Sequence, residues 1–119
     1  MIRRAYLLAA AALCITSPAF AHAMLERASP PVGSEAASPP HEIVLTFTEG
    51  VEPLFSSIEV RNAEGTVVTT GKPHVMAGNA RRLAVDLPAL KGGKYTVIWH
   101  VTSEDTHKTE GSFQFSVAR

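Results

Sequence analysis

The sequence predicts an all-β fold: a single small Greek-key β-sandwich or barrel of immunoglobulin-like type, with about seven strands. Apolar and polar residues alternate with period two along several short runs, as they do in strands that bury one face. Clusters of Gly, Pro, Asn and Ser separate the runs, and little of the chain shows helical periodicity. No internal repeat or linker divides the chain, so one domain accounts for it.

Residues 1–21 are expected to form an export signal rather than part of the fold. Arg3 and Arg4 make a basic start, and an apolar run covers residues 5–15. The small residues Ala19 and Ala21 then suit the −3 and −1 positions of a cleavage site. The apolar run is too short to span a bilayer, which argues against a membrane anchor. Cleavage after Ala21 would leave residues 22–119 as the mature domain.

In five runs of the mature chain, apolar and polar residues alternate clearly. The residues expected to share the core-facing side of each run are Ile43, Leu45 and Phe47; Ile58 and Val60; Leu83, Val85 and Leu87; Tyr95, Val97, Trp99 and Val101; and Phe113, Phe115 and Val117. Trp99 lies within the longest run and is expected to fill the core, whereas His100 should lie on the opposite face. Residues 72–80 are polar and small, which predicts a loop or a poorly formed edge strand.

The composition excludes several classes of function. Lys and Arg number 11 against 11 Asp and Glu, and only 18% of the chain is charged, so it lacks the basic stripe that nucleic-acid binding needs. The single cysteine, Cys14, falls within the predicted export signal. The mature domain is therefore expected to have no disulfide, no thiolate metal site and no cysteine nucleophile. Any metal must be bound by nitrogen, oxygen or thioether ligands.

Cleavage after Ala21 would make His22 the first residue of the mature chain. The new α-amine and the imidazole Nδ1 then lie on one residue, and together they close a six-membered chelate ring around an ion. Imidazole and amine nitrogens in tetragonal geometry suit Cu(II), which also heads the affinity order of the divalent metals. The alternative is a histidine that cleavage happens to expose on a loose terminus.

A second candidate ligand pair lies in residues 103–107, between the longest run and the last one. Asp105 and His107 are two positions apart, so a locally extended backbone would point both side chains to the same side. With the two nitrogens of His22 they would supply three nitrogens and one oxygen, close to the square-planar set that Cu(II) prefers. The alternative is that Asp105 accepts hydrogen bonds within a turn and His107 is solvated.

Four stretches carry a resemblance to a known family. They are H-A-M-L-E-R-A-S-P-P-V-G-S at 22–34, V-L-T-F-T-E at 44–49, the pattern G-x-Y-x-V-x-W-x-V-x-S-x-D-x-H at 93–107, and G-S-F-Q-F at 111–115. Together they resemble the copper-resistance protein C (CopC) family, whose members begin with histidine. Thr106 stands where family members usually have Gly, which we interpret as a sign that no positive φ is needed there and that the D-T-H segment is extended.

The resemblance implies a periplasmic Cu(II) carrier or buffer with a cupredoxin-like or immunoglobulin-like β-barrel, and not an enzyme. His22 would supply its amine and Nδ1, Asp105 a carboxylate oxygen and His107 an imidazole nitrogen. The partners implied are the copper ion and, for delivery, an inner-membrane CopD-type copper transport protein. Some members also bind Cu(I) through a methionine-rich loop. Here the comparable region offers only His74 and Met76, so a Cu(I) site is expected to be weak or missing.

Two other functions stay open at this point. An N-terminal histidine chelate with a second histidine resembles the copper site of polysaccharide monooxygenases, but a ligand from Asp105 would close the position that O₂ needs. A metal-free immunoglobulin-like interaction module is the other alternative. Indifference to copper would favour the module, and turnover of a polysaccharide would favour the enzyme.

Overall fold

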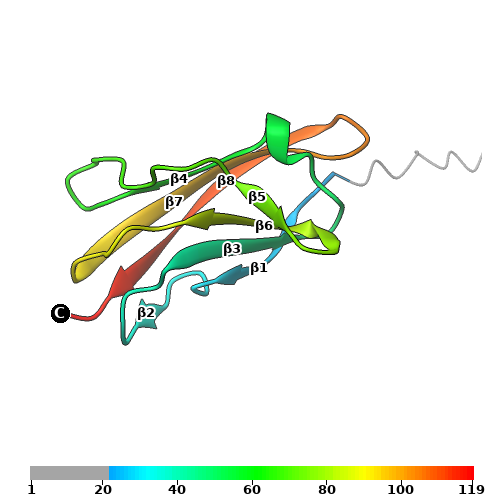
Figure 1. The fold of residues 1–119 in the computed structure, drawn as a ribbon. Helices are drawn as coiled ribbons and strands as arrows, with labels where there is room; N and C mark the ends of the chain where they lie inside the picture. Colours follow the sequence, from blue (N-terminus) through cyan, green and yellow to red (C-terminus); the bar gives the residue numbers. More distant parts are fainter. Residues whose placement is uncertain (1–21) are drawn as a thin grey trace, which may run out of the picture.

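A computed structural model describes residues 22–119 as two four-stranded sheets packed face to face (Figure 1). The elements are β1 Leu25–Ser29, β2 Glu35–Ala36, β3 Glu42–Phe47, the 3₁₀ turn η1 Pro53–Phe55, β4 Ser57–Arg61, β5 His74–Met76, β6 Asn79–Asp86, β7 Gly93–Thr102 and β8 Lys108–Val117. The predicted all-β sandwich is confirmed, with eight strands against the expected seven or so. The predicted export signal lies outside the described residues.

One sheet has the order β1-β3-β6-β5 and the other the order β2-β8-β7-β4. Neighbouring strands are antiparallel except β2, which runs parallel to β8. The short β5 forms the edge of its sheet with a bulge in its pairing, which confirms the poorly formed edge strand expected within residues 72–80. No helix in the described part of the chain is long and apolar enough to cross a membrane.

The core lies between the sheets and is built from the faces that alternation predicted. Within the core, Phe47 and Trp99 meet edge to face, with ring centroids 5.2 Å apart. Leu87, which alternation assigned to a strand, lies one residue past β6 and packs half-buried against the core. Gly111 pairs with Trp99 across β7 and β8, and a Cβ there would lie 2.5 Å from the indole ring. The close approach of these strands over Trp99 therefore requires glycine at this position.

The long β7–β8 hairpin positions the candidate site. Its ten paired positions run from Gly93 and Val117 at one end to Thr102 and Lys108 at the other. The connection between the strands, residues 103–107, carries Asp105 and His107 (Figure 1). The start of the described chain lies at this same end, because Thr109 of β8 bonds to Ala23. The fold therefore brings His22 to the hairpin from the opposite end of the domain sequence.

Candidate metal centre

The backbone from His22 to Met24 is anchored to β8 and to the residue that follows β3. Ala23 is fully buried in the core, and its carbonyl accepts a hydrogen bond of 2.7 Å from the Thr109 hydroxyl. Thr48 and Met24 hydrogen-bond through their backbones at 2.9 Å, and the Met24 N–H donates to the Thr48 hydroxyl at 3.0 Å. The Thr48 hydroxyl in turn donates to the His22 carbonyl at 3.3 Å. The imidazole of His22 therefore projects from a fixed point, which argues against the loose-terminus alternative.

The connection between β7 and β8 is a tight turn organised by Ser103, whose side chain is buried. The Ser103 N–H donates to the His107 carbonyl at 2.8 Å, and the Thr106 N–H donates to the Ser103 carbonyl at 2.9 Å. The Ser103 hydroxyl hydrogen-bonds to the Asp105 carboxylate. An isolated bridge from Val51 to Ser103 ties the turn to the preceding segment. The positions of Asp105 and His107 are thus determined by a compact hydrogen-bonded unit.

The expectation of an extended D-T-H segment is wrong. Thr106 has a φ of +72°, in the left-handed region that β-branched residues rarely adopt. The turn bonds made by Ser103 hold it there, and its own hydroxyl donates to the Asp105 carbonyl at 2.5 Å. A glycine would adopt this φ without strain, whereas this chain adopts it with Thr.

Asp105 and His107 nevertheless meet, because the turn folds back instead of extending. The Nδ1 atom of His107 is shielded from solvent and lies 3.2 Å from Asp105 Oδ2. The imidazoles of His22 and His107 lie edge to face with centroids 5.0 Å apart. All three sequence-predicted ligands are therefore neighbours. Among residues 22–119, however, no group of three or more His, Cys, Asp or Glu side chains is already arranged to hold a metal ion.

The electrostatics around Asp105 suit a cation. The hydrogen bond from Ser103 is the main cause that holds the pKa of Asp105 below its ordinary value of 3.8, with smaller contributions from His107. Partial desolvation opposes this shift without reversing it. Asp105 is therefore a carboxylate at neutral pH. It also borders a small recess of about 130 Å³ that Glu49 and Glu104 line, which adds negative charge beside the hairpin.

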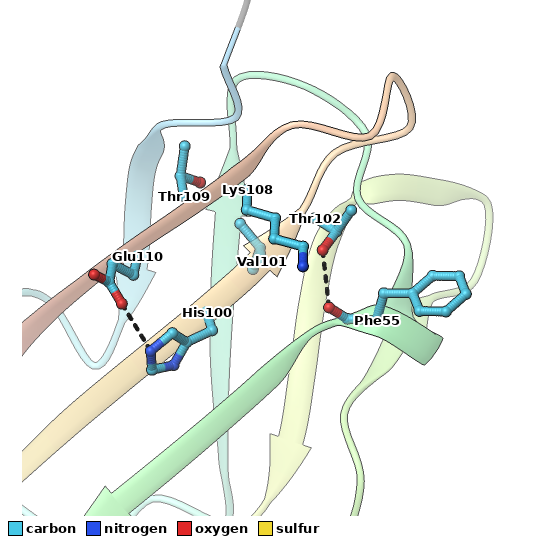
Figure 2. A pocket seen from close by; sticks show the side chains of 7 residues that line it. All are labelled: Phe55, His100, Val101, Thr102, Lys108, Thr109 and Glu110. Atoms are coloured by element: carbon cyan, nitrogen blue, oxygen red, sulfur yellow. Dashed lines mark hydrogen bonds and ion pairs between the residues drawn. The ribbon is translucent and has the colours of Figure 1, made fainter.

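The remaining candidate ligands lie elsewhere. His74 and Met76 are on the edge strand β5, where His74 is exposed and Met76 half-buried, and their binding of Cu(I) stays a prediction. His100 is exposed on the outer face of β7, as expected, and its Nε2 lies 2.8 Å from Glu110 Oε2 (Figure 2). This pair borders a hollow of about 500 Å³ beside Phe55, and none of the three predicted copper ligands lines that hollow.

Sequence reasoning missed the residues that position the site. The Thr48 hydroxyl bonds to the His22 carbonyl, and the Thr109 hydroxyl bonds to the carbonyl of the next residue, Ala23. The Ser103 hydroxyl bonds to the Asp105 carboxylate and accepts the His107 N–H. The threonine contacts join segments far apart in sequence, so no local pattern identifies them. Ser103 offered a signal, because a Ser two residues before an Asp at a strand end is a common turn former.

The CopC domain family matches residues 25–118. Protein YobA of Escherichia coli is 36% identical over 104 residues, which cover 87% of this chain and 84% of that protein. Copper resistance protein C of Xanthomonas campestris pv. juglandis is 34% identical over 114 residues, covering 90% and 88% of the two chains.

Copper transport protein CutJ of Bacillus subtilis is 34% identical over 101 residues, which cover 84% of this chain but only 19% of that longer protein. Among solved structures, the crystal structure of CopC from Methylosinus trichosporium superposes with a TM-score of 0.77 at 36% identity, covering 82% of this chain and 94% of that chain. The sequence and structural similarities therefore span nearly the whole described domain.

Proposed function

The chain belongs to the CopC domain family. On this premise we propose that it is a periplasmic Cu(II) carrier or buffer. It binds one ion through His22, Asp105 and His107. The observation that carries the proposal is the 5.0 Å approach of the His22 and His107 rings beside the Asp105 carboxylate. These groups come from the two ends of the domain sequence, and their meeting has no evident role in the hydrophobic core.

The proposed ligand set depends on export. Cleavage after Ala21 frees the α-amine of His22, which then binds the ion together with its own Nδ1. His107 adds a second imidazole nitrogen, and Asp105 adds an oxygen whose negative charge offsets that of the ion. Three nitrogens and one oxygen are a set that Cu(II) favours in tetragonal geometry. The anchored backbone at Ala23 supports the proposal, because little ordering entropy is left to lose on binding.

A carrier must also release its ion to a recipient. We propose that copper passes to an inner-membrane copper transport protein of the CopD type. A similar segment forms part of the longer copper transport protein CutJ, which supports a close functional link between this domain and copper transport. Four donor atoms from three residues leave little open coordination for O₂, so the proposed site favours binding and transfer over oxidative turnover.

Titration of the purified exported protein with Cu(II) tests the proposal. We expect one tight equivalent and an EPR signal of a tetragonal centre with mixed nitrogen and oxygen ligands. His100→Ala is the matched control, since that imidazole pairs with Glu110 outside the proposed site, and it should leave the stoichiometry and the signal unchanged. A protein that takes up no Cu(II), or whose signal depends on His100, contradicts the assignment.

Copper affinity is expected to decrease as the pH decreases from about 8 to about 5, because protons compete with the ion for the imidazole and amine nitrogens. The lowered pKa of Asp105 keeps this carboxylate charged throughout that window. Ser103→Ala removes the main cause of that lowered pKa and also the hydroxyl bonds that hold the turn, so it should weaken Cu(II) binding at every pH, with a further loss in acidic solution. Dissociation constants measured against a competing chelator check this, and a flat profile from pH 8 to 5 would contradict nitrogen ligation.

A further inference from the structure

Met24 lies two residues after His22, in the segment that leads into β1. Its carbonyl accepts the 2.9 Å hydrogen bond from Thr48, and the next pair along, Leu25 with Phe47, belongs to the β1–β3 ladder. Met24 therefore continues the extended strand before β1 begins. Leu25 packs against the core whereas Met24 is 57% exposed, so successive side chains here alternate between the inside and the outside of the sandwich.

This alternation places Met24 on the same side of the segment as His22. Ala23, which lies between them, is fully buried in the core, while its two neighbours are exposed. Residues two positions apart in an extended strand have Cα atoms about 7 Å apart, and their side chains share one face. Methionine is unbranched and has three rotatable side-chain bonds. The Met24 thioether can therefore reach an ion that is bound to the His22 imidazole.

The donor atoms at this end of the domain differ in the oxidation state of copper that they prefer. Nitrogen and oxygen donors in tetragonal geometry suit Cu(II), a thioether selects Cu(I), and imidazole binds copper in either state. The 5.0 Å approach of the His22 and His107 rings supplies two imidazoles beside the Met24 segment. Two imidazoles and one thioether form a donor set that is soft enough for Cu(I).

We propose that Met24 binds Cu(I), together with the imidazoles of His22 and His107, at the end of the domain that carries the proposed Cu(II) site. The inference rests on the proposed function and adds to it a ligand that serves only the reduced ion. Met24 is not required for Cu(II), because the amine, the two imidazoles and Asp105 complete that set. A carrier with this ligand keeps its copper in either oxidation state.

The other methionine of residues 22–119 is less well placed to share an ion with a histidine. Met76 lies two positions after His74 on β5, but a bulge between Val75 and Met76 interrupts the pairing with β6. Strand alternation therefore does not place the two side chains on one face there. Met76 is also half-buried, whereas Met24 is exposed. Met76 thus offers a matched control for Met24.

Anaerobic titration of the purified exported protein with Cu(I), supplied as its acetonitrile complex, tests the inference by NMR. A chain that begins at His22 has two methionines, so its spectrum contains two methionine methyl signals, which the variants Met24→Leu and Met76→Leu assign. Cu(I) is diamagnetic, so both signals stay visible when the ion binds. We expect one equivalent of Cu(I) to shift the Met24 signal and to leave the Met76 signal in place.

Competition with a Cu(I)-specific chelator measures the affinity. Met24→Leu should raise the Cu(I) dissociation constant at least about tenfold, because loss of an outer group that only orients a ligand already costs that much. Met76→Leu should leave this constant unchanged. Both variants should keep the Cu(II) affinity and the EPR signal, since neither side chain belongs to the Cu(II) set. Leucine replaces methionine at nearly equal volume, and Met24 is exposed, so the fold should be kept.

The outcomes separate this inference from the proposed function. If the protein binds Cu(II) as proposed, an unmoved Met24 signal, or equal Cu(I) affinities of the native protein and Met24→Leu, overturns the inference alone. A shift of the Met76 signal, or a loss of Cu(I) affinity in Met76→Leu, would assign the reduced ion to β5 and overturns it as well. Cu(I) binding that depends on Met24, in a protein that takes up no Cu(II), supports the inference and contradicts the proposed Cu(II) carrier.

Discussion

Adding one residue before His22 is expected to weaken Cu(II) binding by more than about 100-fold. Loss of an outer group that only orients a ligand already costs 10- to 100-fold in metal affinity, and the added residue converts a direct amine ligand into a peptide nitrogen. It also separates the free amine from the His22 ring, so the six-membered amine–Nδ1 chelate is lost. The dissociation constant measured against a competing chelator gives the change, and EPR reports the loss of one nitrogen ligand.

The same residue added after Arg119 is the matched control, because it alters the chain by the same amount far from the hairpin. Ala23, which is buried and bonded to Thr109, follows the new residue in the chain and keeps these contacts. The extended protein should therefore keep its fold and its thermal unfolding midpoint. The unprocessed chain that begins at Met1 should bind as weakly as the extended one. Equal affinities for the extended and the native exported protein would exclude the amine from the ligand set.

Much of the fold could be predicted from the sequence because the information is local. Alternation along single strands identified the buried faces of β3, β4, β6, β7 and β8, and turn residues identified their ends. The strands β1 and β2 are short and weakly alternating, so they contributed only to the approximate strand count. Their place in the sheets depends on pairing with β3 and β8, which no local pattern specifies.

The residues of the candidate site could be predicted from the sequence, but their arrangement in space could not. Asp105 and His107 were paired on the assumption of an extended segment, whereas the structure pairs them through a turn with a left-handed Thr106. The residue type alone argued against that conformation, because β-branched side chains rarely adopt positive φ. The turn is determined instead by Ser103, which is buried and bonded within the same five residues. Tertiary burial thus overrode a local preference.

His107→Ala is expected to weaken Cu(II) binding by more than about 100-fold as well, because it removes an imidazole nitrogen and leaves Asp105 without its neighbour. The side chain lies outside the core cluster, so the variant should unfold at nearly the native temperature. His41→Ala is the matched control, since His41 is exposed and offers an imidazole outside the site. Equal losses in the two variants would point to non-specific copper binding by surface histidines.

Combining His107→Ala with the N-terminal extension distinguishes one shared ion from two separate ones. If His22 and His107 bind the same ion, either change disrupts the tetragonal set, and the second change should cost much less than it does alone. Two independent sites would instead give losses that multiply, because changes at sites without shared partners are usually additive in free energy. The 5.0 Å separation of the two rings predicts the first outcome. A multiplicative result would assign the two histidines to different ions and would require another explanation for their approach.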